Sequence, residues 1–389
     1  MKILIATDTY YPSVNGAAYF TYRLANTLVQ RGYEVFVICP SKSFKNTIIK
    51  DKGVTIYGIR SIHIPVYKNF RMSPSIFSKK TIYKTIKEIF PDVVHIQNHF
   101  LIGKGTAIVA KKLGIPIVGT NHFMPENLVH YFHLPKIAET WLQKFGWKQC
   151  VDVFEKLDLV TTPTETAKEL LKKAGFSKEV LALSCGIDLE RFKPTNDGSY
   201  LKQRYEIPIN KAVLLYVGRM DKEKRVEVIL HALLDILRTN DAHLVLAGIG
   251  EEKQKLETLS QKLGVQKSVT FTGFVPDEDL QNIYRVADIF VIAGIAELQS
   301  IVTMEAMASG LPIVAVNAMA LPELVHDSKN GFLFPIDDSQ ALAQKVTTIL
   351  SDHKLQKEMS KESLEIIKAH DMTKIIKRYE SIYHEVTNQ

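Results

Sequence analysis

The sequence predicts an α/β protein made of two doubly wound domains in tandem. Its 389 residues are too many for one ordinary domain and suit two domains of roughly 150–200 residues each. In each half, short apolar runs alternate with segments of helical periodicity, the order expected for parallel strands covered by helices on both faces. Hydrophobic residues make up 46% of the chain and charged residues 23%, which excludes a disordered protein, a collagen-like fibre and a small disulfide scaffold.

The predicted elements follow the same alternation in both halves. In the first half we predict strands at residues 2–7, 34–39, 54–59, 93–96 and 115–120, with helices at 17–31, 79–90 and 105–113. In the second half we predict strands at residues 212–217, 243–247, 269–272, 289–293 and 313–316, with helices at 226–238, 251–263, 280–287 and 302–309.

A cluster of proline, glycine and short polar residues between positions 186 and 210 indicates the join. We therefore predict a first domain over residues 1–194 and a second over 195–371. The amphipathic helix predicted at 372–389 is expected to cross back to the first domain. Since doubly wound domains bind ligands outside the carboxyl ends of their strands, we expect the two domains to face each other across a cleft that holds a shared site.

The loop after the strand at 212–217 has the composition of a diphosphate site. Gly218 allows close backbone approach, and the cations Arg219 and Lys224 would neutralise the phosphate charge. A solvated loop between a strand and a helix is the alternative explanation, because basic residues are common in such loops.

Two carboxylates flank the start of the helix predicted near residue 300. Glu297 lies in the preceding loop and Glu305 lies inside the helix, where both are placed to accept hydrogen bonds from sugar or ribose hydroxyls. The backbone amides of Ser300, Ile301 and Val302 would act as anion donors at the helix start. The alternative is a capping arrangement between Ser300 and a nearby glutamate.

Two further loops at the same strand edge are candidates for holding a nucleobase. The candidate residues are Gly248, Phe274 and Val275, which supply backbone and aromatic groups. The glycines of these loops are equally explained as turn residues.

The Gly-Arg-x4-Lys and Glu-x7-Glu elements, together with the layout from Met1 to about Tyr383, resemble the retaining glycosyltransferases of family 4. That resemblance implies the GT-B fold of two Rossmann-like domains and transfer of a sugar from a nucleotide donor with retention at the anomeric carbon. It assigns Arg219 and Lys224 to the diphosphate, Glu305 to the ribose and Glu297 to the transferred sugar. Arg225 departs from the family, which commonly has glycine after this lysine.

The resemblance also points to residues of the first domain. Gly16 follows the first strand where the family usually has two glycines, and we assign it to the diphosphate; an ordinary turn is the alternative. His122 follows the strand at 115–120 and matches the histidine that contacts the donor sugar near the reacting carbon. We assign Asn98 and His99, which end the strand at 93–96, to the acceptor region.

The resemblance implies catalysis without a covalent protein nucleophile, by stabilising the leaving diphosphate and orienting the sugar and the acceptor. We list His122 and Glu297 as the catalytic residues, and we do not interpret Glu297 and Glu305 as the acid and base of a glycosidase. Family members require no metal, and Asp337 and Asp338 are interpreted as surface residues. The prediction is therefore no metal site and no cofactor besides the nucleotide-sugar co-substrate, a UDP- or GDP-hexose.

The charge distribution favours an anionic partner for the first half. Residues 1–194 hold 27 Lys and Arg against 15 Asp and Glu, while residues 195–389 hold 22 against 27. The basic amphipathic helix within 76–90 and the segment 123–148, which holds Trp141, Trp147 and several lysines, suit a membrane surface. Core packing and uneven surface charge are the alternatives. Residues 121–127 are also similar to diacylglycerol glucosyltransferases and phosphatidylinositol mannosyltransferases.

We therefore expect a hexosyltransferase that acts on a membrane lipid such as diacylglycerol, with a soluble or peripheral transferase of a polysaccharide or undecaprenyl-linked acceptor as the alternative. An epimerase, a phosphorylase or a binding protein with the same architecture is a further alternative. We expect no nucleic-acid partner, because the lysines are dispersed and no recognition motif is present. No apolar run is long enough to span a bilayer, no secretory signal begins the sequence and the three cysteines are widely spaced. These features predict a cytoplasmic protein attached peripherally to the inner face of the cell membrane. The sequence makes no prediction about the oligomeric state.

Overall fold

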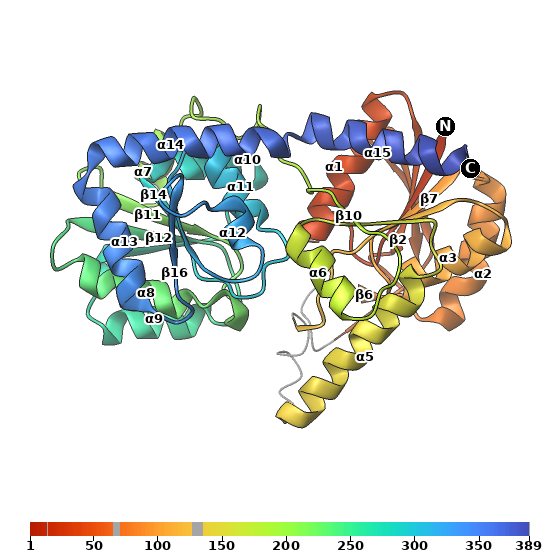
Figure 1. Ribbon diagram of the computed structural model, residues 1–389, viewed down its shortest axis with the longest axis horizontal. Helices are drawn as coiled ribbons and strands as arrows, with labels where there is room; N and C mark the ends of the chain where they lie inside the picture. The colour runs from red at the N-terminus through yellow and green to blue at the C-terminus, as the bar shows by residue number, and fades with distance from the viewer. Residues whose placement is uncertain (14, 65–70, 127–134, 389) are drawn as a thin grey trace. The chain divides into compact units, whose positions relative to one another are not determined.

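The computed structural model describes residues 1–13, 15–64, 71–126 and 135–388, and the chain forms two compact units (Figure 1). Unit 1 contains Met1–Cys185 and Thr373–Gln389, and unit 2 contains Gly186–Met372. The first crossing between the units thus lies at Cys185 and Gly186, whereas the sequence analysis placed it after residue 194. Both units are α/β with mainly parallel sheets, which confirms the predicted fold class.

Unit 1 is built around an eight-stranded sheet with the order β10-β9-β8-β7-β1-β2-β4-β3. Its strands are β1 (Lys2–Ala6), β2 (Glu34–Pro40), β3 (Thr47–Asp51), β4 (Val54–Ile59), β7 (Val93–Ile96), β8 (Ile117–Thr120), β9 (Leu159–Thr162) and β10 (Leu181–Ala182), with β5 (Ile62–His63) and β6 (Arg71–Met72) in a separate pair. Its helices are α1 (Gly16–Gln30), α2 (Ser75–Ile89), α3 (Leu101–Lys112), α5 (Lys136–Phe154), α6 (Glu165–Lys173) and α15 (Met372–Thr387). Strand β3 pairs antiparallel with β4, and the other pairings in this sheet are parallel.

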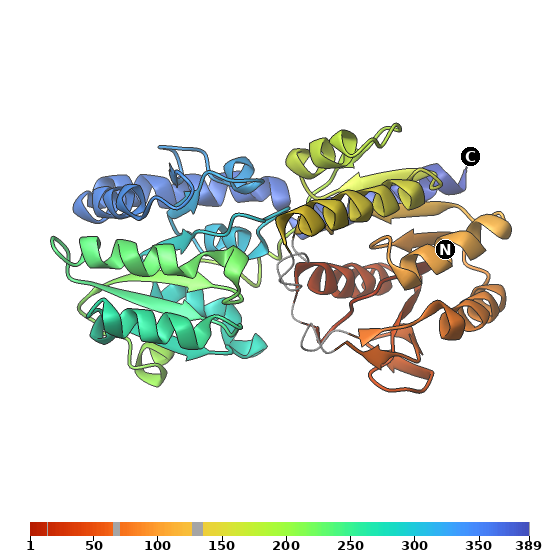
Figure 2. The ribbon, with the colours of Figure 1, turned by 90° about the horizontal axis from the view of Figure 1, so that it is seen from below.

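Helices cover both faces of this sheet (Figures 1 and 2). One face forms a single apolar cluster with α2, α3 and α5. On the other face α1 meets α15, where the rings of Phe20 and Tyr379 lie 5.7 Å apart. Arg31 at the end of α1 pairs with Glu380 of α15 at 2.6 Å. The helix predicted at the end of the chain therefore belongs to unit 1.

A buried polar network also attaches α15 to the sheet. The ring of His95 on β7 bonds to the Tyr383 hydroxyl at 2.8 Å and to the Thr120 hydroxyl of β8 at 2.7 Å. Burial lowers the pKa of His95 to about 3, so the ring is neutral. Because both ring nitrogens are bonded, the core accommodates this polar side chain without an unpaired group.

Unit 2 has a six-stranded parallel sheet with the order β13-β12-β11-β14-β15-β16. Its strands are β11 (Ala212–Val217), β12 (Ala242–Ala247), β13 (Val269–Gly273), β14 (Ile289–Ile292), β15 (Ile313–Val316) and β16 (Gly331–Phe334). Its helices are α7 (Ser199–Arg204), α8 (Val226–Ile236), α9 (Lys253–Lys262), α10 (Asp277–Ile283), α11 (Ile301–Ala308), α12 (Leu321–Leu324), α13 (Ser339–Ser351) and α14 (His353–Ile367). Helix α8 contacts α9 and α13, and α11 contacts α14.

Several element boundaries differ from the predictions for local reasons. Helix α2 begins directly after Pro74 and α3 begins after Phe100, each about one turn earlier than predicted. Strand β8 begins at Ile117 rather than at residue 115, since Pro116 has no N–H for the ladder. The exposed edge strand β3 was not predicted because its TIIKD sequence lacks the alternation of a half-buried strand.

Candidate active site

The predicted donor residues of unit 2 meet where the strand order of the sheet reverses. The chain runs β11, β12, β13 in one direction and then places β14 on the other side of β11. The loop after β11 carries Arg219 and Lys224, and the loop after β14 carries Glu297. The two loops are bonded to each other, because the Ile295 amide donates to the Glu223 carbonyl at 3.1 Å. This reversal point is where doubly wound sheets bind ligands.

Glycines allow the loops after β11 and β12 to pack backbone against backbone. Gly248 has φ +148°, and a Cβ at this position would lie 1.9 Å from the Gly218 carbonyl oxygen. The same contact includes a bond from the Gly218 amide to the Ala247 carbonyl at 2.9 Å. Gly248 is therefore required by the packing of the loop, and its assignment to the nucleobase stays a prediction.

Buried carboxylates hold the guanidinium of Arg219. Arg219 forms an ion pair with Asp221 and a second one with Glu223, whose Oε1 lies 3.1 Å away. Both acids are buried. The sequence analysis missed them, although acids two and four positions after a phosphate-binding arginine are a visible signal. Their charge fixes the direction of the guanidinium before any ligand arrives.

Lys224 and Glu297 form an ion pair between the two loops. The Lys224 Nζ lies 2.7 Å from the Glu297 Oε1, and both side chains are mostly buried. The sequence analysis assigned the lysine to the diphosphate and the glutamate to the transferred sugar. The ion pair therefore places these two side chains next to each other. A bound phosphate would replace Glu297 as the partner of Lys224, and a sugar hydroxyl would replace Lys224 as the partner of Glu297.

The start of α11 carries backbone amides without a side-chain cap. Ser300 occupies the N-cap position, but its Oγ accepts from the Thr303 hydroxyl at 2.8 Å instead of from an amide. The Met304 amide bonds to the Ser300 carbonyl at 3.2 Å. The amides of Ile301 and Val302 come before it and have no carbonyl partner within the helix. The capping alternative is therefore not observed, and these amides remain candidates for anion binding.

Glu305 is almost completely buried, with 2% of its surface exposed. Its Oε2 accepts a hydrogen bond from the Tyr284 hydroxyl at 2.6 Å. Tyr284 follows α10, and the sequence gave no signal that its hydroxyl would reach α11. The bond orients the carboxylate that we assigned to ribose hydroxyls.

The two remaining nucleobase candidates, both in the loop after β13, differ in exposure. Phe274 is 54% exposed, whereas Val275 is buried. Phe274 alone of the two therefore presents a side-chain surface on which a base can stack.

In unit 1, the strand order reverses between β1 and β7, and the loops after these strands carry polar side chains. Gly16 is the first residue of α1, and Asn15 caps this helix by accepting from the Ala18 amide at 2.9 Å. Asn98 accepts from the Phe100 amide at 3.3 Å. Asn98 and His99 are both buried, so their assignment to the acceptor region stays a prediction.

His122 is held at both of its ring nitrogens. Its Nε2 lies 2.9 Å from Gln97 Oε1, and its Nδ1 lies 3.8 Å from Cys185 Sγ. Burial raises the pKa of Cys185 to about 12 and lowers the pKa of His122 to about 3. The thiol therefore keeps its proton and donates to Nδ1, while Nε2–H donates to the amide oxygen of Gln97. The imidazole is neutral with one fixed tautomer, which suits orientation of a ligand and not proton donation at neutral pH.

Three buried polar atoms near His122 have no hydrogen-bond partner among the residues that the structure describes. They are Gln97 Nε2, His99 Nδ1 and Asn121 Nδ2, which follow the ends of β7 and β8. Unpaired buried polar groups are rare in proteins and need an explanation. A polar ligand at this edge of the sheet would satisfy them. The sequence analysis missed Gln97 because nothing in the strand pattern shows that its amide faces His122.

Asp8, also missed, stabilises the segment that carries Asn98 and His99. It lies just after β1 and accepts from the Ile102 amide at 3.0 Å and the Gly103 amide at 3.2 Å, which places a carboxylate at the start of α3. Burial raises the pKa of Asp8 to about 6 despite these two bonds.

The two tryptophans assigned to the acceptor region have different environments on α5. Trp141 is 66% exposed and stacks on Phe145. Trp147 packs against the core of unit 1, and its Nε1 donates to Glu126 at 3.1 Å. Core packing therefore accounts for Trp147 and not for Trp141.

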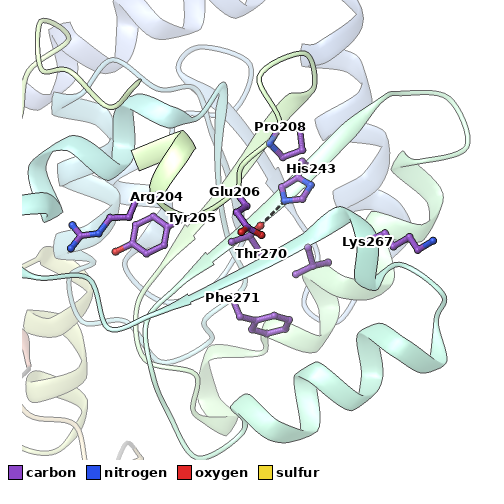
Figure 3. Close-up of a pocket in the computed structure, with 9 residues that line it drawn as sticks. Arg204, Tyr205, Glu206, Pro208, His243, Lys267, Thr270 and Phe271 are labelled. Atoms are coloured by element: carbon purple, nitrogen blue, oxygen red, sulfur yellow. Dashed lines mark hydrogen bonds between the residues drawn. The ribbon is translucent and has the colours of Figure 1, made fainter. Parts of the chain in front are cut away.

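A hollow of about 500 Å³ lies at the opposite edge of the sheet in unit 2 (Figure 3). His243 and Thr270, which are joined by a 2.8 Å hydrogen bond, lie at the amino ends of β12 and β13. The candidate donor residues follow the carboxyl ends of the strands, so this hollow is separate from the candidate active site.

Comparison with known proteins matches this fold to glycosyltransferases of the GT-B class. Residues 200–365 match the family model "Glycosyl transferases group 1", and residues 14–191 match "Glycosyltransferase Family 4". Together the two models account for most of the chain, and the chain belongs to the glycosyltransferases of family 4.

Its relatives include two proteins named alpha-monoglucosyldiacylglycerol synthase. The chain is 29% identical to an alpha-monoglucosyldiacylglycerol synthase of Streptococcus pneumoniae over 86% of this chain and 75% of the relative. It is 26% identical to an N-acetyl-alpha-D-glucosaminyl L-malate synthase of Bacillus anthracis over 99% and 98% of the two chains. Among solved structures, Anabaena HepE in complex with UDP-glucose has a TM-score of 0.79 at 20% identity, covering 99% of this chain and 100% of that chain, which supports the fold.

Proposed function

We propose that the protein is a retaining hexosyltransferase that moves a hexose from a UDP- or GDP-sugar to a membrane lipid such as diacylglycerol. The observation that carries the donor half is the cluster at the strand reversal of unit 2. Arg219, Lys224, their carboxylate partners and the first amides of α11 meet there, with Phe274 exposed on the loop after β13. Relatives that are named alpha-monoglucosyldiacylglycerol synthases support the acceptor half.

In the proposed reaction, the bond between the anomeric carbon and the β-phosphate oxygen breaks, and the acceptor oxygen forms its bond on the same face. The proton of the acceptor hydroxyl goes to the departing phosphate. Arg219, Lys224 and the α11 amides stabilise the diphosphate that leaves. Glu305 binds the ribose, Glu297 binds the transferred hexose, and His122 orients the sugar through its neutral imidazole. We propose that these cations replace a metal ion in neutralising the phosphates.

The amino-terminal part of α5 supports a membrane acceptor. No residue of α5 before Cys150 is buried, and the helix projects beyond the sheet of unit 1 (Figure 1). Ile137, Trp141 and Phe145 are spaced four residues apart, so they form one exposed apolar stripe. An aromatic stripe with lysines beside it suits the boundary between lipid headgroups and acyl chains. From this stripe we propose peripheral attachment to the cytoplasmic face. No helix in the described part of the chain is long and apolar enough to cross a membrane.

The experiment that tests this proposal is a transfer assay with UDP- and GDP-hexoses against diacylglycerol, a polysaccharide and an undecaprenyl-linked acceptor. The proposal predicts a glycolipid product with the anomeric configuration of the donor, formed equally well with a chelator present. Glu305→Ala should weaken donor binding, and His122→Ala should chiefly lower kcat. Transfer to the polysaccharide or the undecaprenyl-linked acceptor, with none to diacylglycerol, would establish the alternative function instead.

A further inference from the structure

A groove between α3 and α5 combines an apolar floor with a ring of lysines. Its volume is about 270 Å³. Lys104, Lys111, Lys112 and Lys156 surround it. Ala107 and Val153 form its buried floor, and Ile108 is 44% exposed between the lysines.

The four lysines carry charge that the protein does not balance locally. Lys104 Nζ donates to the neutral Gln149 Oε1 at 3.2 Å, and Lys111 Nζ donates to the Lys156 carbonyl at 3.3 Å. Within the described part of the chain, none of the four forms an ion pair with a carboxylate. Helix α3 itself contains no acidic residue. Like charges gathered without counter-charges attract an anionic partner.

This groove continues a basic layer over one face of unit 1. Helices α2, α3 and α5, which pack on the same face of the sheet, contain ten lysines and three acidic residues. Val153 lies near the end of α5, and Lys156 lies two residues beyond that end. The groove therefore adjoins the carboxyl-terminal end of the helix that carries the exposed aromatic stripe.

We propose that the α3–α5 groove binds an anionic phospholipid of the membrane on which the protein works. The lysines contact the headgroup phosphate, and Ala107, Ile108 and Val153 contact the first acyl carbons. A membrane lipid is favoured over a soluble anion because the groove has an apolar floor and adjoins α5, the helix that carries the exposed aromatic stripe. This site is separate from the acceptor site, and its location at the membrane rests on the proposed function.

The test measures sedimentation with phosphatidylcholine vesicles that contain or lack phosphatidylglycerol, without nucleotide sugar. Each lysine near an anionic surface is worth about a fivefold change in binding at low salt, so the triple change K104Q/K111Q/K112Q should weaken binding roughly 100-fold. Ile108→Gln leaves the charge unchanged and should also weaken binding to phosphatidylglycerol. The matched controls are K79Q/K80Q/K84Q and Ile76→Gln on α2, where Ile76 is 83% exposed.

The outcomes separate the possibilities. If Ile108→Gln binds as the parent does and the two triple variants lose equally, the lysines act as a diffuse charged surface and the groove proposal is overturned. If inorganic phosphate or glycerophosphate displaces the protein from vesicles, the groove is a soluble-anion site and the lipid proposal is overturned. Binding is read without transfer, so a groove that binds lipid in a protein that makes no glycolipid would refute only the proposed function.

Discussion

The hydrogen bond between Gln97 and His122 gives a direct test of how the imidazole is used. Gln97 is fully buried, and its Oε1 accepts from His122 Nε2 at 2.9 Å. Gln97→Leu removes this acceptor and leaves the ring N–H unpaired, a loss of about 1–3 kcal/mol. If the orientation of the ring matters in the transition state, kcat should fall by roughly 5- to 150-fold while the KM for the donor changes little.

A second variant at this position tests the protonation state of His122. Gln97→Glu places a carboxylate beside a ring whose pKa burial has lowered to about 3, and such a neighbour raises a pKa by about 1–3 units. The imidazolium form would then appear as the pH falls through about 4 to 6. The ratio of variant to parent kcat should therefore decline as the pH is lowered from 8 to 5, whereas the parent should show no inflection from His122 in this range.

The assay is steady-state transfer of a radiolabelled hexose at several pH values. Thr106→Val is the matched control, because Thr106 is buried in unit 1 and its hydroxyl has no partner in the described part of the chain, so its loss should leave kcat unchanged. Parent values of kcat and KM in Gln97→Leu would show that Gln97 does not position His122. A loss of kcat accompanied by an equal loss of folded protein would refute the reasoning as well.

Four further changes test other contacts. Lys224→Met should weaken nucleotide-sugar binding by about 1.5–3 kcal/mol in titration calorimetry. The loss should be smaller when Glu297→Gln is already present, because the two side chains are paired. Strictly additive losses in the double variant would argue against this coupling. Tyr284→Phe should lower the free energy of unfolding by about 1–3 kcal/mol in urea, and an unchanged midpoint would contradict the role of the hydroxyl. Burial raises the pKa of Asp8 from 3.8 to about 6, so the folded protein binds this proton more tightly than the unfolded chain does. Stability from this group is present below pH 4 and is lost by roughly 3 kcal/mol as the pH rises through 6, and Asp8→Asn should remove this part of the pH dependence in urea unfolding. Arg225 has φ +51°, so Arg225→Gly should unfold at nearly the parent urea concentration. Arg225→Val should lower the free energy of unfolding by about 1–3 kcal/mol. Equal stability of the two variants would contradict this role of the backbone conformation.

Arg225 also explains a departure from the family pattern. The sequence showed an arginine where family members commonly have glycine, and the structure shows that this position is left-handed at the start of α8. The side chain pairs with Asp337 and with Glu227, which offsets part of the backbone strain. Asp337, interpreted from the sequence as a surface residue, therefore has a structural partner.

The features that the sequence predicted best are the strands and the sheet edge at which the charged loop residues lie. Strands β4, β7, β11 and β15 have the predicted bounds, since each is a short, mostly apolar run. The placement of Arg219, Lys224 and Glu297 at one sheet edge followed from the rule that parallel strands end at a common edge.

Contacts between side chains from distant segments could not be predicted in the same way. Tyr284 reaches Glu305 over 21 residues and Gln97 reaches His122 over 25, and no local pattern encodes either distance. Asp221 and Glu223 lie next to Arg219 in sequence, yet their burial depends on the fold of the loop. The sequence therefore indicated the charged residues that contact a ligand better than the residues that hold them in place.

The assignment of α15 to unit 1 has a consequence for the order in which the protein folds on the ribosome. Unit 2 is one continuous stretch, so it can fold as soon as its last residue leaves the exit tunnel. Unit 1 begins earlier but lacks the partners of Phe20, His95 and Arg31 until the final helix has been synthesised. The unit translated first is thus completed after unit 2, and during that interval the part of its sheet that α15 covers is open to chaperones.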